Sequence, residues 1–361
     1  MSSIVTFLGK GGTGRTISAI ATAKKLATSG KKVLLMGQDP SPAWGMTLGT
    51  TPTAEPIEID ANLSAMQLNS TVLLENSWEQ VKQLEAQYLR SPILKQVYGQ
   101  ELGVLPGMDR ALALNAIREH YQGGQYDAII YDGTGGVDTL RMLGMPEILS
   151  WYFRRFRGVF TESDIVKTLS PFVQPVSSAI LNTTWTANDI TGNTDNPATQ
   201  MLEDGTAALS EGNVLAYLVT TSDPAAVATA KYLWGSAQQV GLKVAGAIAR
   251  GEADLAAEFA PLNVVSLPEY DGSNWQSLID ALPSISEANA PQATEFVMSE
   301  RKVKVYLPGF NKKDVKLTQY GPEITIEAGD QRRNITLPPA WRGSSVTGAK
   351  FQNGYLEVTV G

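Results

Sequence analysis

The feature that most restricts the fold is a glycine-rich loop between a short apolar segment and a helical one. Residues 3–8 are apolar and strand-like, and residues 17–29 have helical periodicity that ends at Gly30. The eight residues between them fit the pattern G-x-x-x-x-G-[K/R]-T: Gly9, Lys10, Gly11, Gly12, Thr13, Gly14, Arg15 and Thr16. Strand, loop and helix in this order distinguish a phosphate-binding loop from a glycine-rich turn, so the sequence predicts nucleotide binding.

The loop residues have separate predicted roles. Glycines let backbone N–H groups surround phosphates, and the start of the following helix adds the positive end of its dipole. Thr16 is predicted to bind Mg²⁺ through its hydroxyl, and Ile17 completes the predicted nucleotide-binding set. Arg15 stands where a lysine is usual, and its planar guanidinium is bulkier than an ammonium group. We therefore expect nucleotide binding with slow hydrolysis.

The rest of the first 294 residues predicts an α/β fold. Apolar, strand-like segments occur at residues 32–38, 63–68, 127–132, 214–220 and 244–249, with helical stretches between them. Continuous apolar strands indicate burial on both faces, as in a mainly parallel sheet flanked by helices. We predict a P-loop NTPase domain at residues 1–294, with a helical subdomain at roughly 72–100 and 143–209.

Residues 299–361 change to alternating apolar and polar positions, cut by Gly and Pro into about six short strands. This pattern predicts a small all-β sandwich. The segment has ten Lys and Arg against six Asp and Glu, a net charge of +4, which leaves −11 for the rest of this −7 chain. Opposite charges would favour docking of the two parts, although a solvated surface explains them equally simply.

Two aspartates follow predicted strands, Asp39 and Asp132. Either one alone has an ordinary explanation as a helix cap or turn residue. Together, and in this order after a phosphate loop, they predict a catalytic and a metal-binding carboxylate.

Several motifs resemble the ArsA/Get family of arsenite-pump ATPases and tail-anchored-protein targeting factors. They are the loop itself, Asp39-Pro40-Ser41-Pro42-Ala43-Trp44, Leu105-Pro106-Gly107-Met108-Asp109, Asp132-Gly133-Thr134-Gly135-Gly136 and Thr139-Leu140-Arg141. The resemblance implies ATP and Mg²⁺ as cofactors, with the metal held by Thr16, Asp39 and Asp132. It also implies that Asp39 orients the attacking water, and that Lys10 reaches the nucleotide of the opposite subunit in a homodimer. A solvated loop lysine is the simpler alternative for Lys10.

The sequence departs from this family at several positions. Gly135-Gly136 replace the usual proline and small residue, and Arg110 replaces an acidic residue. Arg250 ends the strand at residues 244–249, where relatives place an asparagine that contacts adenine. Base specificity therefore stays open.

The C-terminal segment resembles the α-crystallin domain of small heat-shock proteins. The motif is Ala349-Lys350-Phe351-Gln352-Asn353-Gly354-Tyr355-Leu356, preceded by Val305-Tyr306-Leu307-Pro308-Gly309-Phe310 and Lys313-Asp314-Val315. An architectural role for these residues is favoured over separate client holding. A domain of this type fused to an ArsA/Get ATPase matches a known subgroup of that family.

Composition excludes several functions. The chain has no cysteine, which rules out thiolate sites for arsenite, iron-sulfur clusters and Cys-x-x-Cys zinc clasps. The single His120 cannot form a zinc site alone. The net charge argues against a nucleic-acid partner, and no stretch is long enough for stable membrane insertion, so we expect a cytoplasmic protein.

An aromatic and basic cluster, residues 151–157, precedes further apolar residues, namely Phe160, Ile165, Val166, Leu169, Phe172 and Val176. It is interpreted as helix packing or dimer contact, or as a groove for a hydrophobic client helix. Contact with nucleic acid or membrane is a third alternative. For the whole chain, the main hypothesis is a homodimeric, nucleotide-switched ATPase that binds apolar clients. A non-catalytic pseudo-ATPase or scaffold is the alternative, and a membrane- or DNA-positioning ATPase is a third hypothesis.

Overall fold

The structure is a computed structural model, and it describes residues 2–76, 107–162, 197–283, 285 and 291–361. The predicted helical stretches at residues 77–100 and 163–196 lie outside the described residues. So do Leu105 and Pro106 of the motif that precedes Gly107.

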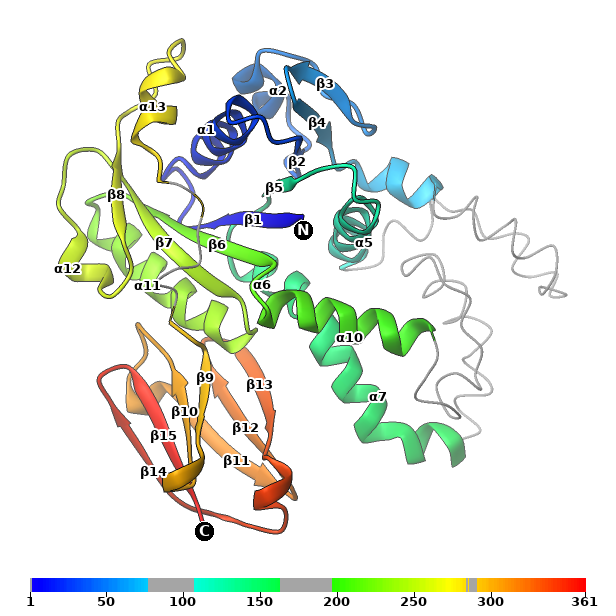
Figure 1. Cartoon of the computed structure of the whole chain (residues 1–361), viewed down its shortest axis with the longest axis vertical. Helices are drawn as coiled ribbons and strands as arrows, with labels where there is room; N and C mark the ends of the chain where they lie inside the picture. Colours follow the sequence, from blue (N-terminus) through cyan, green and yellow to red (C-terminus); the bar gives the residue numbers. More distant parts are fainter. Residues whose placement is uncertain (1, 77–106, 163–196, 284, 286–290) are drawn as a thin grey trace, which may run out of the picture.

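The larger part of the chain is built on one eight-stranded sheet with the order β3-β4-β2-β5-β1-β6-β7-β8 (Figure 1). All neighbouring strands are parallel except β3, which is antiparallel to β4. The strands are β1 (Ser3–Leu8), β2 (Val33–Gly37), β3 (Ile57–Asp60), β4 (Leu63–Gln67), β5 (Ala128–Asp132), β6 (Val214–Thr220), β7 (Lys243–Arg250) and β8 (Val264–Leu267). The predicted α/β fold is confirmed.

The two edge strands, β3 and β8, were not predicted. Both are only four residues long, and neither is fully buried. The inner strands β2, β5 and β6 are buried at every position, which is why their continuous apolar runs were recognisable.

Helices cover both faces of the sheet. On one face α1 (Arg15–Thr28), α2 (Pro42–Leu48) and α13 (Gln276–Ala281) pack in one apolar cluster. On the other face lie α5 (Met108–Gln122), α6 (Val137–Leu143), α11 (Pro224–Gln239) and the short α12 (Ala256–Phe259). Within β5, Ile130 contacts the first cluster and Ile129 the second, so consecutive side chains serve opposite faces.

Two further helices, α7 (Met145–Glu162) and α10 (Pro197–Ser210), extend from the body of the molecule (Figure 1). They pack against each other. Within the described ranges, no helix combines the length and apolar character needed to cross a bilayer.

The C-terminal part is a small antiparallel β sandwich, as predicted. One sheet has the order β14-β15-β10-β9 and the other β11-β12-β13. Buried side chains of both sheets, among them Val305, Ile326 and Val358, form a single core around Trp341. The strands are β9 (Thr294–Val297), β10 (Lys302–Tyr306), β11 (Lys316–Tyr320), β12 (Glu323–Ala328), β13 (Gln331–Thr336), β14 (Val346–Gln352) and β15 (Tyr355–Val360).

The sandwich packs directly on α11 of the larger part (Figure 1). Trp234 on α11 meets Tyr306 of β10 edge to face, with ring centroids 5.5 Å apart. The Tyr232 hydroxyl donates to the Gly329 carbonyl at 2.9 Å, and Arg333 Nη1 donates to the Gln238 carbonyl at 2.5 Å. Apolar packing and hydrogen bonds from side chains to backbone carbonyls therefore join the two parts.

Helices α6 and α7 also contact the sandwich. Arg141 on α6 forms an ion pair with Asp330, and Trp151 Nε1 on α7 donates to Glu323 at 3.2 Å. The Arg155 guanidinium lies 3.5 Å from the ring centroid of Tyr320. Trp151 and Arg155 of the aromatic and basic cluster thus pack on the sandwich.

Candidate functional site

The predicted site residues meet at the carboxyl edge of the parallel sheet. In the strand order β2-β5-β1, the phosphate loop follows β1, Asp39 follows β2 and Asp132 ends β5. Backbone bonds join these ends, since Gln38 N donates to Asp132 O at 3.0 Å and Gly9 N donates to Gly135 O at 2.9 Å. Ligands of parallel α/β sheets bind at this edge.

The loop has the backbone conformation that a phosphate site needs. Gly12 and Gly14 have φ of 83° and 93°, a region that favours glycine, and α1 begins directly afterwards at Arg15. The Thr13 hydroxyl closes the loop by donating to the Lys10 carbonyl at 2.8 Å. Gly9 and Thr13 are buried against the protein, whereas Gly11 and Gly12 between them are exposed, so the middle of the loop is open to solvent. An anionic ligand fits above the N-terminus of this 14-residue helix.

Asp132 is a buried carboxylate with Trp44 and Thr16 beside it. Trp44 Nε1, on α2, donates to its Oδ2 at 3.0 Å. Burial raises the pKa of Asp132 to about 6, against the opposing effects of Thr16, Arg15 and Trp44. Thr16 and Asp132, both predicted metal ligands, therefore lie close together, and hard oxygen donors of this kind suit Mg²⁺.

The raised pKa of Asp132 predicts a measurable pH dependence. Because 3.8 is its ordinary pKa, the folded state binds more protons than the unfolded state between pH 4 and 6. The stabilising contribution of this group is full at low pH and falls by about 3 kcal/mol as pH rises through 6. In nucleotide-free protein, the free energy of unfolding of wild type minus that of Asp132→Asn should fall over this window in urea titrations. A difference that stays constant from pH 4 to 7 would contradict the assignment.

Asp39 lies beside this carboxylate but is exposed. Its Oδ1 accepts from Ser41 N at 2.8 Å, and its carbonyl accepts from Gln67 Nε2 at 2.6 Å, which fixes the turn between β2 and α2. The negative charge of Asp39 is one of the causes that raise the pKa of Asp132, so the two carboxylates lie within electrostatic range. Asp39 is thus held at the rim of the site with access to solvent.

Arg15 lies across the segment that follows β5. Its Nη1 donates to the Gly133 carbonyl at 3.2 Å. Burial lowers the pKa of Arg15, while the charge of Asp132 opposes that effect. A Cβ atom on Gly135 would overlap the Arg15 guanidinium, with 2.7 Å to Cζ. Two departures from the family pattern, arginine at 15 and glycine at 135, therefore fit each other sterically.

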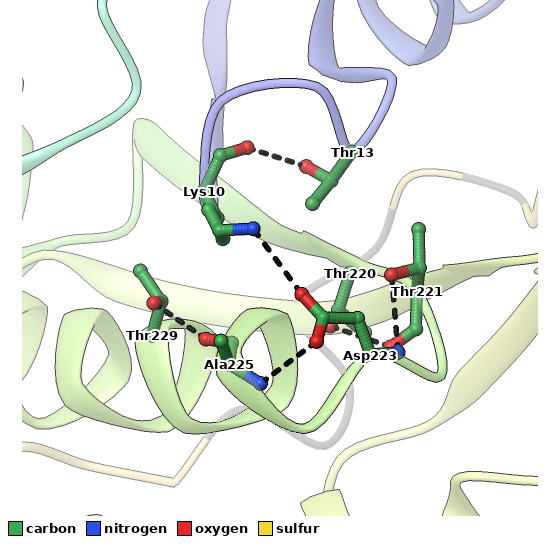
Figure 2. A network of polar contacts seen from close by, with 7 residues as sticks. All are labelled: Lys10, Thr13, Thr220, Thr221, Asp223, Ala225 and Thr229. Carbon is green, nitrogen blue, oxygen red and sulfur yellow. Dashed lines mark hydrogen bonds and ion pairs between the residues drawn. The ribbon is translucent and has the colours of Figure 1, made fainter.

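Lys10 points to α11 in the isolated chain (Figure 2). Its Nζ lies 3.2 Å from Oδ2 of Asp223, the N-cap residue of α11, whose Oδ1 accepts from Ala225 N at 3.2 Å. The hydrogen bond from Lys10 is the main cause that lowers the pKa of Asp223. Both side chains are about half exposed, at 48% and 47%, so the contact is easily exchanged.

The fold thus brings every predicted site residue, Gly9 to Ile17 with Asp39 and Asp132, to one edge of the sheet. Three contacts of the site were not predicted from the sequence. Trp44 donates a hydrogen bond to Asp132, Thr139 accepts one from Gly135 N at 3.0 Å, and Asp223 forms an ion pair with Lys10. A signal existed for Asp223, since an aspartate directly before Pro224 and after an apolar strand is typical of a helix N-cap.

Comparison with known proteins agrees with this site. The family model described as anion-transporting ATPase matches residues 2–209, and the model described as HSP20-like domain found in ArsA matches residues 299–360. The first match includes the loop, Asp39 and Asp132, and the second includes the sandwich strands β10 to β15.

Individual relatives are similar over the whole chain or over the site. A protein of Prosthecochloris vibrioformis named "Putative arsenical pump-driving ATPase" is 27% identical over 98% of this chain and 95% of its own length. A protein of the same name from Chlorobaculum tepidum has the same identity and coverage. The ATPase get3 of Schizosaccharomyces japonicus is 30% identical over 42% of this chain and 46% of its own length.

Proposed function

This chain belongs to the anion-transporting ATPase family, and from that premise we propose that it is a slow, nucleotide-switched ATPase that closes as a homodimer around ATP and Mg²⁺. The observation that carries the proposal is the open glycine loop at the sheet edge where the buried Asp132 ends β5, with Asp39 exposed after β2. In this role the loop amides hold phosphate oxygens, and Thr16 with Asp132 and Asp39 holds the metal ion. Bound Mg²⁺ neutralises charge on the phosphates. Asp39 orients the attacking water.

The homodimer rests on the position of Lys10. An exposed lysine at the second position of the loop is free to exchange Asp223 for an anion on a facing subunit, because exposed ion pairs contribute little stability. We propose that Lys10 leaves Asp223 and contacts the nucleotide of the partner when the dimer closes.

The dimer is tested by two variants that move the equilibrium in opposite directions. Lys10→Ala should reduce ATP-dependent dimerisation at least tenfold, since it removes a charge-assisted contact to phosphate. Asp223→Asn keeps an N-cap residue on α11 but releases Lys10, and should favour the dimer by up to about fivefold. Analytical ultracentrifugation with and without ATP and Mg²⁺ measures both. Equal dimerisation of wild type and Lys10→Ala would rule the proposal out.

The side chains available in this sequence limit the kind of cargo that the protein can bind. The chain has no cysteine, so thiolate capture of arsenite is not available to it. We propose an apolar client segment, bound by the region predicted as helical at roughly residues 143–209, of which residues 163–196 lie outside the described part of the chain. Trp151 and Arg155 are not assigned to that surface, because they pack on the sandwich.

A non-catalytic nucleotide-binding protein is the second candidate, favoured by Arg15. In the catalytic case, Arg15→Lys should raise the ATP turnover number about tenfold or more, because a compact ammonium fits between phosphates better than a guanidinium. Gly135→Ala should impair nucleotide binding more in the wild-type background than in Arg15→Lys, because the guanidinium adds Nη1 and Cζ to the atoms that the new Cβ overlaps. The backbone strain of alanine at φ 62° is common to both backgrounds. Phosphate release measures the turnover number of each variant, and nucleotide titration measures its affinity for the nucleotide. Unchanged turnover of correctly folded Arg15→Lys would favour the non-catalytic protein.

A further inference from the structure

Arg250 is the last residue of β7, and its side chain reaches the phosphate loop. β7 lies two strands from β1 in the order β1-β6-β7, so the carboxyl ends of both strands face the same edge. A Cβ atom placed on Gly14 would be 2.7 Å from Arg250 Nη1 and 2.8 Å from Nε. The guanidinium therefore lies directly against Gly14, the N-cap residue of α1.

This guanidinium lacks a complete set of acceptors. Among the described residues, Arg250 Nε is buried and has no hydrogen-bond partner. Buried polar groups of proteins are nearly always hydrogen-bonded, and leaving a charged donor unpaired is costly. A donor of this kind beside an open glycine loop points to a ligand acceptor.

The two cations of the loop itself both have protein partners in the nucleotide-free chain. Lys10 is paired with Asp223, and Arg15 donates to the Gly133 carbonyl. A polyphosphate above the loop needs positive charge close by, and the planar fork of arginine matches phosphate oxygens in a bidentate manner. Arg250 offers such a fork beside the loop of its own subunit.

We propose that Arg250 binds a phosphate group of the nucleotide, in the same subunit as the loop. The proposal deepens the proposed ATPase function and rests on it. In this role Arg250 supplies positive charge before the dimer closes, and glycine at position 14 leaves the space in which the guanidinium lies. The ligand atoms recognised are phosphate oxygens, and the base is not contacted.

The test compares two ligands that share phosphates but not a base. Calorimetric titrations of the full chain with ATP and with inorganic tripolyphosphate, both with Mg²⁺, are made on wild type, Arg250→Gln, Arg250→Lys and the exposed control Arg342→Gln. Arg250→Gln should weaken both ligands by about tenfold or more, as expected for a lost hydrogen bond to a charged group. Arg250→Lys should recover part of the loss for both, and Arg342→Gln should match wild type.

Each other result overturns the proposal. If Arg250→Gln weakens ATP but not tripolyphosphate, Arg250 contacts the base or ribose. If Arg250→Gln and Arg250→Lys bind both ligands like wild type, Arg250 only packs against Gly14. Should Arg250→Gln fail to fold, Arg250→Lys still decides, because a phosphate contact predicts equal weakening of both ligands. Wild type that binds neither ligand would remove the proposed ATPase function itself.

Discussion

Replacing Asp39 with asparagine should lower the turnover number for ATP by about a hundredfold or more, while the affinity for ATP with Mg²⁺ changes only a few-fold. Asparagine keeps the size of the side chain and an oxygen that can accept from Ser41 N. It loses the negative charge with which Asp39, at the exposed rim beside Asp132, would orient and polarise water, a contribution of about 10²–10⁴ in rate. Phosphate release at saturating ATP and calorimetric titration separate the two effects.

A matched control is available in Asp60→Asn. Asp60 ends β3, which runs antiparallel to β4, so it lies near the start of β4 at the opposite edge of the sheet. Its partner is Lys24, at 3.6 Å. Asp60→Asn should therefore hydrolyse ATP at the wild-type rate. If Asp39→Asn retained a third of wild-type turnover, a role for Asp39 in orienting water would be untenable.

Truncating Trp234 to alanine should lower the free energy of unfolding by about 3–5 kcal/mol, the usual cost of deleting a fully buried tryptophan side chain. Only 2% of Trp234 is exposed, and its ring meets Tyr306 of the sandwich edge to face. The indole Nε1 has no hydrogen-bond partner among the described residues, so the loss is one of packing. Urea denaturation followed by circular dichroism measures the change.

Trp234→Phe is the control for this experiment. Phenylalanine keeps an aromatic ring against Tyr306 and should recover more than half of the loss. Because Trp234 and Tyr306 belong to one apolar cluster, the alanine variant should also loosen the sandwich from α11 and increase its cleavage by protease. A loss below 1 kcal/mol with unchanged proteolysis would show that the sandwich is not docked on α11 in solution.

Local patterns were sufficient for much of this protein. The glycine loop between an apolar strand and a helix was sufficient to predict a phosphate site, because glycine spacing and the start of a helix are properties of consecutive residues. Continuous apolar runs located β2, β5 and β6, and alternation located the strands of the sandwich. The short edge strands β3 and β8 carry no such pattern, since their side chains are partly exposed.

Chain order also placed Asp39 and Asp132 correctly at one edge. In a parallel sheet the carboxyl ends of all strands face the same side, so a polar residue after each strand is brought to that side whatever the strand order. The sequence alone therefore determined that the glycine loop and the two aspartates of the predicted site lie at one edge of the sheet.

Only the tertiary structure decided which distant side chains meet there. Lys10 and Asp223 are 213 positions apart, and their contact depends on β6 lying beside β1. The fit of Arg15 against Gly135, and of Arg250 against Gly14, depends in the same way on how closely the strand ends at this edge approach one another. Docking of the sandwich on α6, α7 and α11 likewise joins surfaces that no local pattern relates. Periodicity reports which face of an element is buried, whereas the partner on that face is set by strand order and packing distance, which are properties of the folded chain.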